Sequence, residues 1–226
     1  MSRIAAAFEA LRSKNEKALI AYIMAGDPSL KATEQYFHSL VAAGVDIIEL
    51  GIPFSDPIAD GPTIQAASDR ALKSGTDADR VIALAKHIRE KNAFTPIIFM
   101  TYYNIFFKYG LEKFARDASG CVDGFIVPDL PVEESSELLS CCSKYNIDLI
   151  FLIAPTTPPE RIRRITEIGR GFVYLVSRMG VTGAKTSLAG STMELLERVK
   201  SYSIPKAVGF GISKPEHVKA IVNAGA

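Results

Sequence analysis

The amino-acid sequence predicts a parallel α/β fold and, within that class, a (β/α)8 barrel of the TIM type. Short apolar runs rich in Val, Ile, Leu and Phe recur along the chain, and each is followed by a longer stretch with the spacing of an amphipathic helix. Most runs are unbroken rather than alternating, which indicates a sheet covered on both faces. Seven evenly spaced units with no GxGxxG after the first run favour a barrel over a doubly wound open sheet.

The expected elements form one domain over residues 1–226. An amphipathic stretch at about 3–12 comes first and is expected to be a helix that caps the floor of the barrel. Because each is a short apolar run, the expected strands are 19–24, 45–50, 96–100, 124–127, 149–153, 172–176 and 207–210. Because their apolar residues recur at helical spacing, the expected helices between and after them are 31–43, 77–92, 111–119, 132–145, 159–168, 191–202 and 215–223.

Composition excludes several classes of function. Lys and Arg number 26 against 25 Asp and Glu, so the net charge of +1 gives no field suited to nucleic acid. The three cysteines, Cys121, Cys141 and Cys142, suit neither a disulfide framework nor a CxxC metal site, and a reducing cytoplasm is expected. No stretch of 18 apolar residues occurs, so neither membrane insertion nor secretion is expected.

The candidate catalytic residues follow from the position of barrel active sites, which lie at the C-terminal ends of the strands. Glu49 stands among Ile47, Ile48 and Leu50, where lost hydration would raise its pKa and make it a general acid. Asp60, in the Gly- and Pro-bounded loop that follows, is expected to ionise more readily, so the two carboxyls can divide acid and base roles. Alternatively, Glu49 is a structural carboxylate paired with a buried Lys or Arg, and Asp60 is a turn residue.

The segment ELGIPFSDPIADGPTIQ, residues 49–65, resembles the signature of the tryptophan synthase alpha subunit family. The similarity extends, in family order and from end to end of the chain, through AYIMAGDP, MTYYNIFFKYG, VPDLPVEES, APTTP, YLVSRMGVTG and GFGIS. The resemblance implies the cleavage of indole-3-glycerol phosphate to indole and glyceraldehyde 3-phosphate, a reverse aldol reaction. It implies no metal and no cofactor in this subunit, pyridoxal phosphate being expected only in the beta partner.

The resemblance also implies a role for each matching residue. Glu49 protonates the indole ring carbon and then acts as base at the side-chain hydroxyl, while Asp60 hydrogen-bonds the indole nitrogen. Thr182 belongs to a lid that closes onto Asp60. The remaining substrate contacts are an apolar slot at Tyr22, Ile64, Met100 and Tyr174, a position near the carboxyls at Tyr102, and phosphate-binding main chain at Gly183, Phe210 and Gly211. Plain core packing, a loop hydrogen bond and simple turns are the alternatives for these three groups.

Partner contacts are implied as well. In the family the loop that contains Pro53 and Asp56 faces the beta subunit of an alpha2beta2 heterotetramer, and indole passes to that subunit through a tunnel. A solvated turn is the alternative, since Asp-Pro is a common turn signal.

The sequence departs from the family in two places. Family members continue past Ala226 with a further unit, so the eighth β/α unit is expected to be missing and the first and seventh strands to expose their edges. The chain is then either a fragment or a truncated copy of doubtful activity. The lid differs at Met179 and at residues 185–187.

Two alternative functions remain open at this point. The chain could be a weakly active or inactive alpha subunit that acts mainly as an allosteric activator of the beta subunit. It could also be another phosphate-binding TIM-barrel isomerase, although His38, His87 and His217 all lie in predicted helices and supply no strand-end metal cluster.

Overall fold

The computed structural model describes residues 2–176, 190–209, 212 and 214–226. They form two compact units, Met1–Leu149 and Ile150–Ala226. Each of the seven predicted apolar runs contains a strand, and the fifth run is divided between β5 and β6. The sequence-based assignment to the parallel α/β class is therefore confirmed.

The first unit is built on a parallel sheet. The register places Tyr22 beside Glu49 and Gly51 beside Met100. Every residue of β2, β3 and β4 is buried, which confirms that the unbroken apolar runs are covered on both faces. The edge strand β1 is partly exposed. In spatial order the strands are β1 Ile20–Met24, β2 Ile47–Gly51, β3 Ile97–Met100, β4 Gly124–Ile126 and β5 Asp148–Ile150.

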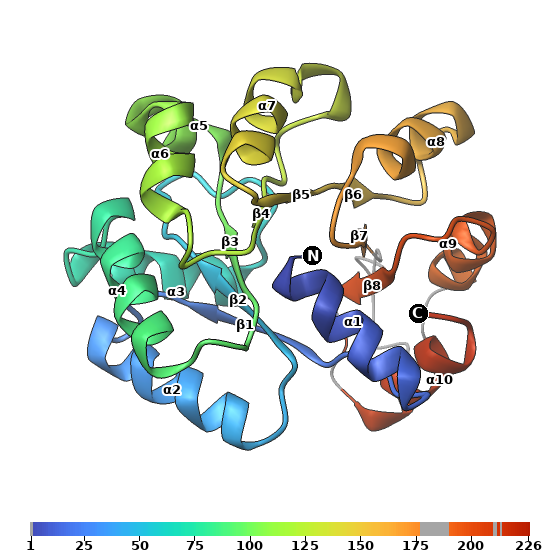
Figure 1. The fold of residues 1–226 in the computed structure, drawn as a ribbon, viewed down its shortest axis with the longest axis horizontal. Helices are drawn as coiled ribbons and strands as arrows, with labels where there is room; N and C mark the ends of the chain where they lie inside the picture. The colour runs from blue at the N-terminus through green and yellow to red at the C-terminus, as the bar shows by residue number, and fades with distance from the viewer. Residues whose placement is uncertain (1, 177–189, 210–211, 213) are drawn as a thin grey trace. The chain divides into compact units, whose positions relative to one another are not determined.

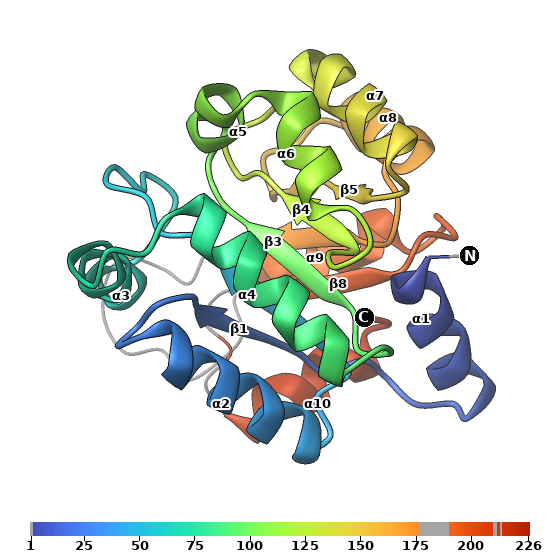
Figure 2. The ribbon, with the colours of Figure 1, turned by 60° about the vertical axis from the view of Figure 1, so that its left-hand side comes forward.

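Helices α2, α4, α6 and α7 lie along one side of this sheet (Figure 1), and α2 and α4 lie side by side (Figure 2). Asp77 begins α4 as an N-cap, because its side chain accepts a hydrogen bond from the Arg80 main-chain N–H. Two of the helices, α3 and α5, lie where the sequence predicts none. The helices of this unit after α1 are α2 Leu30–Ala42, α3 Pro62–Lys73, α4 Ala78–Lys91, α5 Tyr103–Tyr109, α6 Leu111–Ala118, the 3-10 helix η1 Val132–Glu134 and α7 Ser136–Lys144.

The N-terminal helix α1, Arg3–Ser13, is tied to the N-terminal ends of two strands. The Ser2 hydroxyl donates to Asp148 Oδ2 at 2.7 Å, and Arg3 Nη1 donates to Asp123 Oδ1 at 2.8 Å. Asp123 also accepts hydrogen bonds from Arg89 Nη2 and from the Ile97 main-chain N–H, both at 2.8 Å. The predicted N-terminal helix is confirmed, and these contacts hold it at that end of the sheet.

The second unit has a parallel sheet of three strands, in the order β6 Leu152–Ile153, β7 Val173–Val176 and β8 Lys206–Gly209. Its helices are α8 Pro159–Ile168, α9 Gly190–Val199 and α10 Pro215–Asn223. All four residues of the edge strand β8 are partly exposed. Within the described parts of both units, each helix is too short or too polar to cross a lipid bilayer.

Candidate active site

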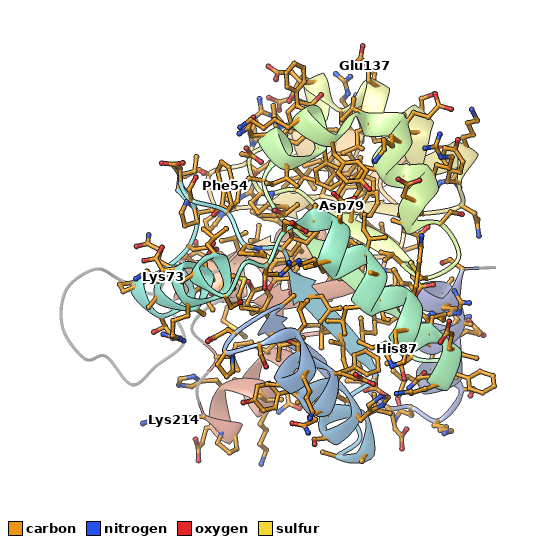
Figure 3. All side chains as sticks on the ribbon, turned by 90° about the vertical axis from the view of Figure 1, so that its left-hand side faces the viewer. Phe54, Lys73, Asp79, His87, Glu137 and Lys214 are labelled. Carbon is orange, nitrogen blue, oxygen red and sulfur yellow. The ribbon has the colours of Figure 1, made fainter. Side chains whose placement is uncertain are left out.

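A pocket in the first unit lies at the C-terminal ends of β1, β2 and β3. Met24 ends β1 and Met100 ends β3, and both side chains line it, as parallel strands that finish at one edge of a sheet require. Figure 3 shows Phe54, on the loop after β2, closer to Asp79 in the first turn of α4 than to His87 in its last turns. The lining residues are Tyr22, Met24, Ile52, Phe54, Asp60, Ser68, Met100, Thr101 and Tyr102.

Glu49 lies on β2 and is not among the lining residues of this pocket, but its neighbour Tyr22 is. It is in register with Tyr22, so the two side chains project from the same face of the sheet. Glu49 is 2% exposed, and its Oε1 has no hydrogen-bond partner among the described residues. Burial raises the pKa of Glu49 to about 8, with no contribution from a Lys or Arg of the described chain. The alternative of a carboxylate paired with a buried cation therefore finds no support among the described residues, and the carboxyl is mostly protonated at neutral pH.

Asp60 is half-buried in the loop after β2, immediately before α3. Burial raises its pKa, and a hydrogen bond from Tyr102 opposes that rise. Gly61 is the N-cap of α3, so Asp60 also stands at the positive end of the helix dipole, which favours its charged form. The two carboxyls therefore occupy unlike environments, and Glu49 has the larger upward shift.

Two tyrosines lie near the carboxyls: Tyr22 is near both Glu49 and Asp60, and Tyr102 is near Asp60. Burial is the largest cause of the raised pKa of both phenols, and the nearby Asp60 adds to it, so both remain protonated. The Tyr102 hydroxyl accepts a hydrogen bond from the Ala59 main-chain N–H at 3.0 Å. Tyr22 passes so close to Gly51 that a Cβ there would stand 2.1 Å from the hydroxyl oxygen, so the position requires glycine.

The structure brings several other predicted residues to this pocket. Met100 lines it, and Ile64 packs with Tyr22 against a buried cluster that contains Met24 and Ala67. Asp56 is exposed at the tip of the loop, where the Ser55 hydroxyl donates to it, whereas Pro53 is buried.

The rest of the predicted site is in or near the second unit. Tyr174 lies on β7 and passes over Gly209, where a Cβ would stand 2.0 Å from its hydroxyl oxygen. The predicted lid residue Thr182 and the predicted phosphate-binding residues Gly183, Phe210 and Gly211 lie outside the described residues.

Sequence analysis missed polar side chains that fix the loop after β2. The Ser68 hydroxyl donates to the Phe54 carbonyl at 2.9 Å and accepts from the Phe54 N–H at 3.0 Å. Thr101 Oγ1 donates to the Ile52 carbonyl at 3.1 Å. Thr101 directly follows β3, so the strand-end rule could have found it, whereas Ser68 lies on α3, which the sequence did not predict.

Among the described residues, no three His, Cys, Asp or Glu side chains lie together in a way that could hold a metal ion. All three histidines lie on helices, as predicted: His38 on α2, His87 on α4 and His217 on α10. The arrangement that remains is a buried, protonated carboxyl and a half-buried one, both near Tyr22 and toward the C-terminal ends of parallel strands. It is typical of an α/β enzyme that works by general acid–base catalysis.

Comparison with known proteins identifies the family. The model of the family "Tryptophan synthase alpha chain" matches residues 8–226, and the chain belongs to that family. It is 54% identical to the tryptophan synthase alpha chain of Methanosarcina acetivorans, covering 99% of this chain and 81% of the relative. It is 51% identical to that of Methanocaldococcus jannaschii, covering 97% and 78%. Family membership confirms the resemblance and gives no support to another phosphate-binding isomerase.

Solved structures agree with the sequence comparison. Tryptophan synthase subunit alpha from Legionella pneumophila superposes with a TM-score of 0.86 at 38% identity, covering 96% of this chain and 80% of that one. A chain from the tryptophan synthase α2β2 complex of Pyrococcus furiosus gives 0.87 at 43%, covering 92% and 84%. The α/β fold is thus the fold of this family.

Proposed function

We propose that this protein is a lyase that cleaves indole-3-glycerol phosphate to indole and glyceraldehyde 3-phosphate with Glu49 and Asp60 as its catalytic residues. The observation that carries the proposal is the burial of Glu49. A carboxyl with a pKa of about 8 is mostly protonated at pH 7, so it is ready to give a proton to carbon. The family uses no cofactor for this reaction.

In the first step Glu49 transfers its proton to the indole carbon that bears the glycerol chain. The ring then carries a positive charge that is shared with its nitrogen. The carboxylate of Asp60 accepts a hydrogen bond from the indole N–H and stabilises that charge. The hydrogen bond from Tyr102 and the N-terminal end of α3 support this role, because both favour the ionised form of Asp60.

In the second step the Glu49 carboxylate takes the proton of the hydroxyl on the adjacent glycerol carbon. The carbon–carbon bond breaks, the carbonyl of glyceraldehyde 3-phosphate forms, and the bonding electrons return to the ring and neutralise its nitrogen. The proton given to the ring stays on indole, and the hydroxyl proton restores Glu49. A single carboxyl thus acts as acid and then as base.

The remaining substrate contacts are proposed from the resemblance. Tyr22, Ile64, Met100 and Tyr174 would form the apolar slot for indole, with Tyr102 next to the carboxyls; of these, Tyr22, Met100 and Tyr102 line the observed pocket. Thr182 would close over Asp60. Gly183, Phe210 and Gly211 would offer main-chain N–H groups to the phosphate.

We also propose that the loop after β2 binds a tryptophan synthase beta subunit, as in the α2β2 complex described for Pyrococcus furiosus. Asp56 is exposed on it and the neighbouring Ile58 is 84% exposed, so both side chains are accessible to a partner. Pro53 would then act from within the loop, since its side chain is buried. Indole would pass to the beta subunit, where pyridoxal phosphate would be bound.

The finer architecture and the location are proposed with the function. The resemblance implies a single (β/α)8 barrel domain that α1 caps, and a crystal structure with substrate bound would test it. A cytoplasmic location is supported by the three cysteines, all free thiols.

The deciding experiment measures indole release from indole-3-glycerol phosphate by the purified protein, alone and mixed with a beta subunit. We expect Glu49→Gln to lower kcat by about 10² to 10⁴, the usual contribution of general acid–base catalysis, and Asp60→Asn to lower it less. Glu16→Gln, an exposed control, should match the wild type. A Glu49→Gln variant as active as the wild type would overturn the mechanism. A wild type that releases no indole yet accelerates the beta subunit would make the chain an activator instead.

A further inference from the structure

The buried serine of α3 holds the main chain of the pocket wall. Ser68 is 1% exposed, and its hydroxyl binds both the N–H and the carbonyl of Phe54, at 3.0 and 2.9 Å. One hydroxyl thus provides both main-chain hydrogen bonds of Phe54, which a neighbouring strand would otherwise provide, and it holds the main chain of that residue in place. Phe54 in turn stacks its ring on Tyr102, with the ring centres 5.2 Å apart.

This contact joins the two segments that carry the carboxyls. Phe54 follows β2, the strand of Glu49, with only Ile52 and Pro53 between it and the last strand residue. Asp60 stands directly before the N-cap of α3, the helix of Ser68. The hydrogen bonds between Ser68 and Phe54 therefore connect the segment that follows β2, the strand of Glu49, to α3, the helix that begins next to Asp60.

Other contacts fix the remainder of the same loop. Tyr102 accepts a hydrogen bond from the Ala59 N–H, and Gln65 Nε2 donates to the Asp60 carbonyl at 2.9 Å. On the far side of α3, Arg70 makes two hydrogen bonds with Asp27, at 2.8 and 2.6 Å. The loop is thus held at several points, and Ser68 holds both main-chain polar groups of Phe54.

We propose that Ser68 is a positioning residue that sets the placement of Glu49 relative to Asp60 through the Phe54 main chain. The inference rests on the proposed function and adds a residue to it. Ser68→Ala removes the donor and the acceptor together, and Phe54 loses both partners in the pocket wall. Because the reaction needs both carboxyls correctly placed on one indole ring, a shift of about 1 Å in their relative position can lower the rate by up to about a hundredfold.

The first experiment compares Ser68→Ala and Ser68→Thr with a matched control. Ser135 is also 1% exposed and donates to a main-chain carbonyl, that of Val132 at 2.8 Å, but it lies before α7 outside the pocket. We expect Ser68→Ala to lower kcat by about tenfold or more with a smaller change in KM, and Ser68→Thr to recover most of the loss. Ser135→Ala should lower the melting temperature to a similar degree and leave kcat unchanged.

The proposal is overturned if folded Ser68→Ala keeps the wild-type kcat, or if Ser135→Ala loses as much. A second measurement does not depend on turnover. In a carbon-13 NMR titration of the carboxyls, Ser68→Ala should move the Glu49 midpoint by about 0.5 pH unit or more, because its surroundings change, and Ser135→Ala should not. An unmoved midpoint overturns the placement role even if the wild type proves inactive, whereas a wild type without indole release overturns the proposed function alone.

Discussion

Burial of Glu49 should make the free energy of unfolding fall as the pH rises. Burial raises the pKa of this carboxyl from 4.5 to about 8 in the folded protein. Below pH 4.5 the folded and unfolded states both hold the proton, so the group adds no pH dependence. Between pH 4.5 and about 8 only the folded state holds it, so each rise in pH favours the unfolded chain. Above about pH 8 both states have lost the proton and the effect no longer grows.

The magnitude follows from the linkage between proton binding and folding. The slope in that window is about 1.4 kcal/mol per pH unit for one proton. At pH 7 the folded protein has therefore lost about 3 kcal/mol relative to its stability at pH 4.5, as an upper bound for this one group. The Glu49→Gln variant keeps the shape of the side chain and has no proton to lose, so it should escape this loss.

Urea denaturation followed by circular dichroism at pH 5, 6, 7 and 8 measures the effect. The free energy of unfolding of Glu49→Gln minus that of the wild type should grow steadily with pH. Taking this difference cancels the titration of all groups that the two proteins share. Glu16→Gln, altered at an exposed position, should stay parallel to the wild type. A constant difference between Glu49→Gln and the wild type across this range would refute the raised pKa and, with it, the acid role.

Three further predictions concern the same unit. Since Glu49 must be protonated to begin the reaction, kcat/KM for indole-3-glycerol phosphate should fall as the pH rises through about 8, and a flat profile to pH 9.5 would contradict this. Gly51→Ala places a Cβ 2.1 Å from the Tyr22 hydroxyl and should lower the melting temperature, whereas adding Tyr22→Leu should recover part of it in thermal denaturation. Asp123→Ala leaves the Arg89 guanidinium unpaired at 10% side-chain exposure and should cost about 3–5 kcal/mol in urea denaturation; a loss under about 1 kcal/mol would show that the ion pair is dispensable.

The strands could be predicted from sequence because burial on both faces leaves a local mark, an unbroken apolar run. The helices α3 and α5 left no such mark. In α3 the buried side chains are small, Ala67, Ser68 and Ala71, and the helix begins with a proline in a segment that otherwise has the composition of a loop. The short α5 consists largely of aromatic and β-branched residues with low intrinsic helix propensity, and the packing of Phe106 on other buried rings decides its structure.

The two proposed catalytic residues, Glu49 and Asp60, also differ in how far their surroundings could be predicted. The burial of Glu49 could be inferred from sequence because it lies in an unbroken apolar run, and such a run is typical of a strand covered on both faces. The contacts that hold the loop of Asp60 could not be inferred. Tyr102, at the start of α5, and Ser68, on α3, bind loop residues that are 43 and 14 positions away in the chain. Contacts of this kind depend on how the elements pack, which no local pattern records.

Two buried acidic residues of the first unit, Asp123 and Glu49, differ in whether they have hydrogen-bond donors around them. Asp123 precedes β4, and Arg89, Arg3 and the Ile97 N–H all donate to its carboxylate. Glu49 is as well buried, but its Oε1 has no such donor among the described residues, and it holds a proton instead. Removing the charge of Asp123 would leave a buried cation without its partner, whereas Glu49 already holds a proton at neutral pH and has no paired cation among the described residues. Neutral amides at the two positions should therefore move the free energy of unfolding at pH 7 in opposite directions, down for Asp123→Asn and up for Glu49→Gln.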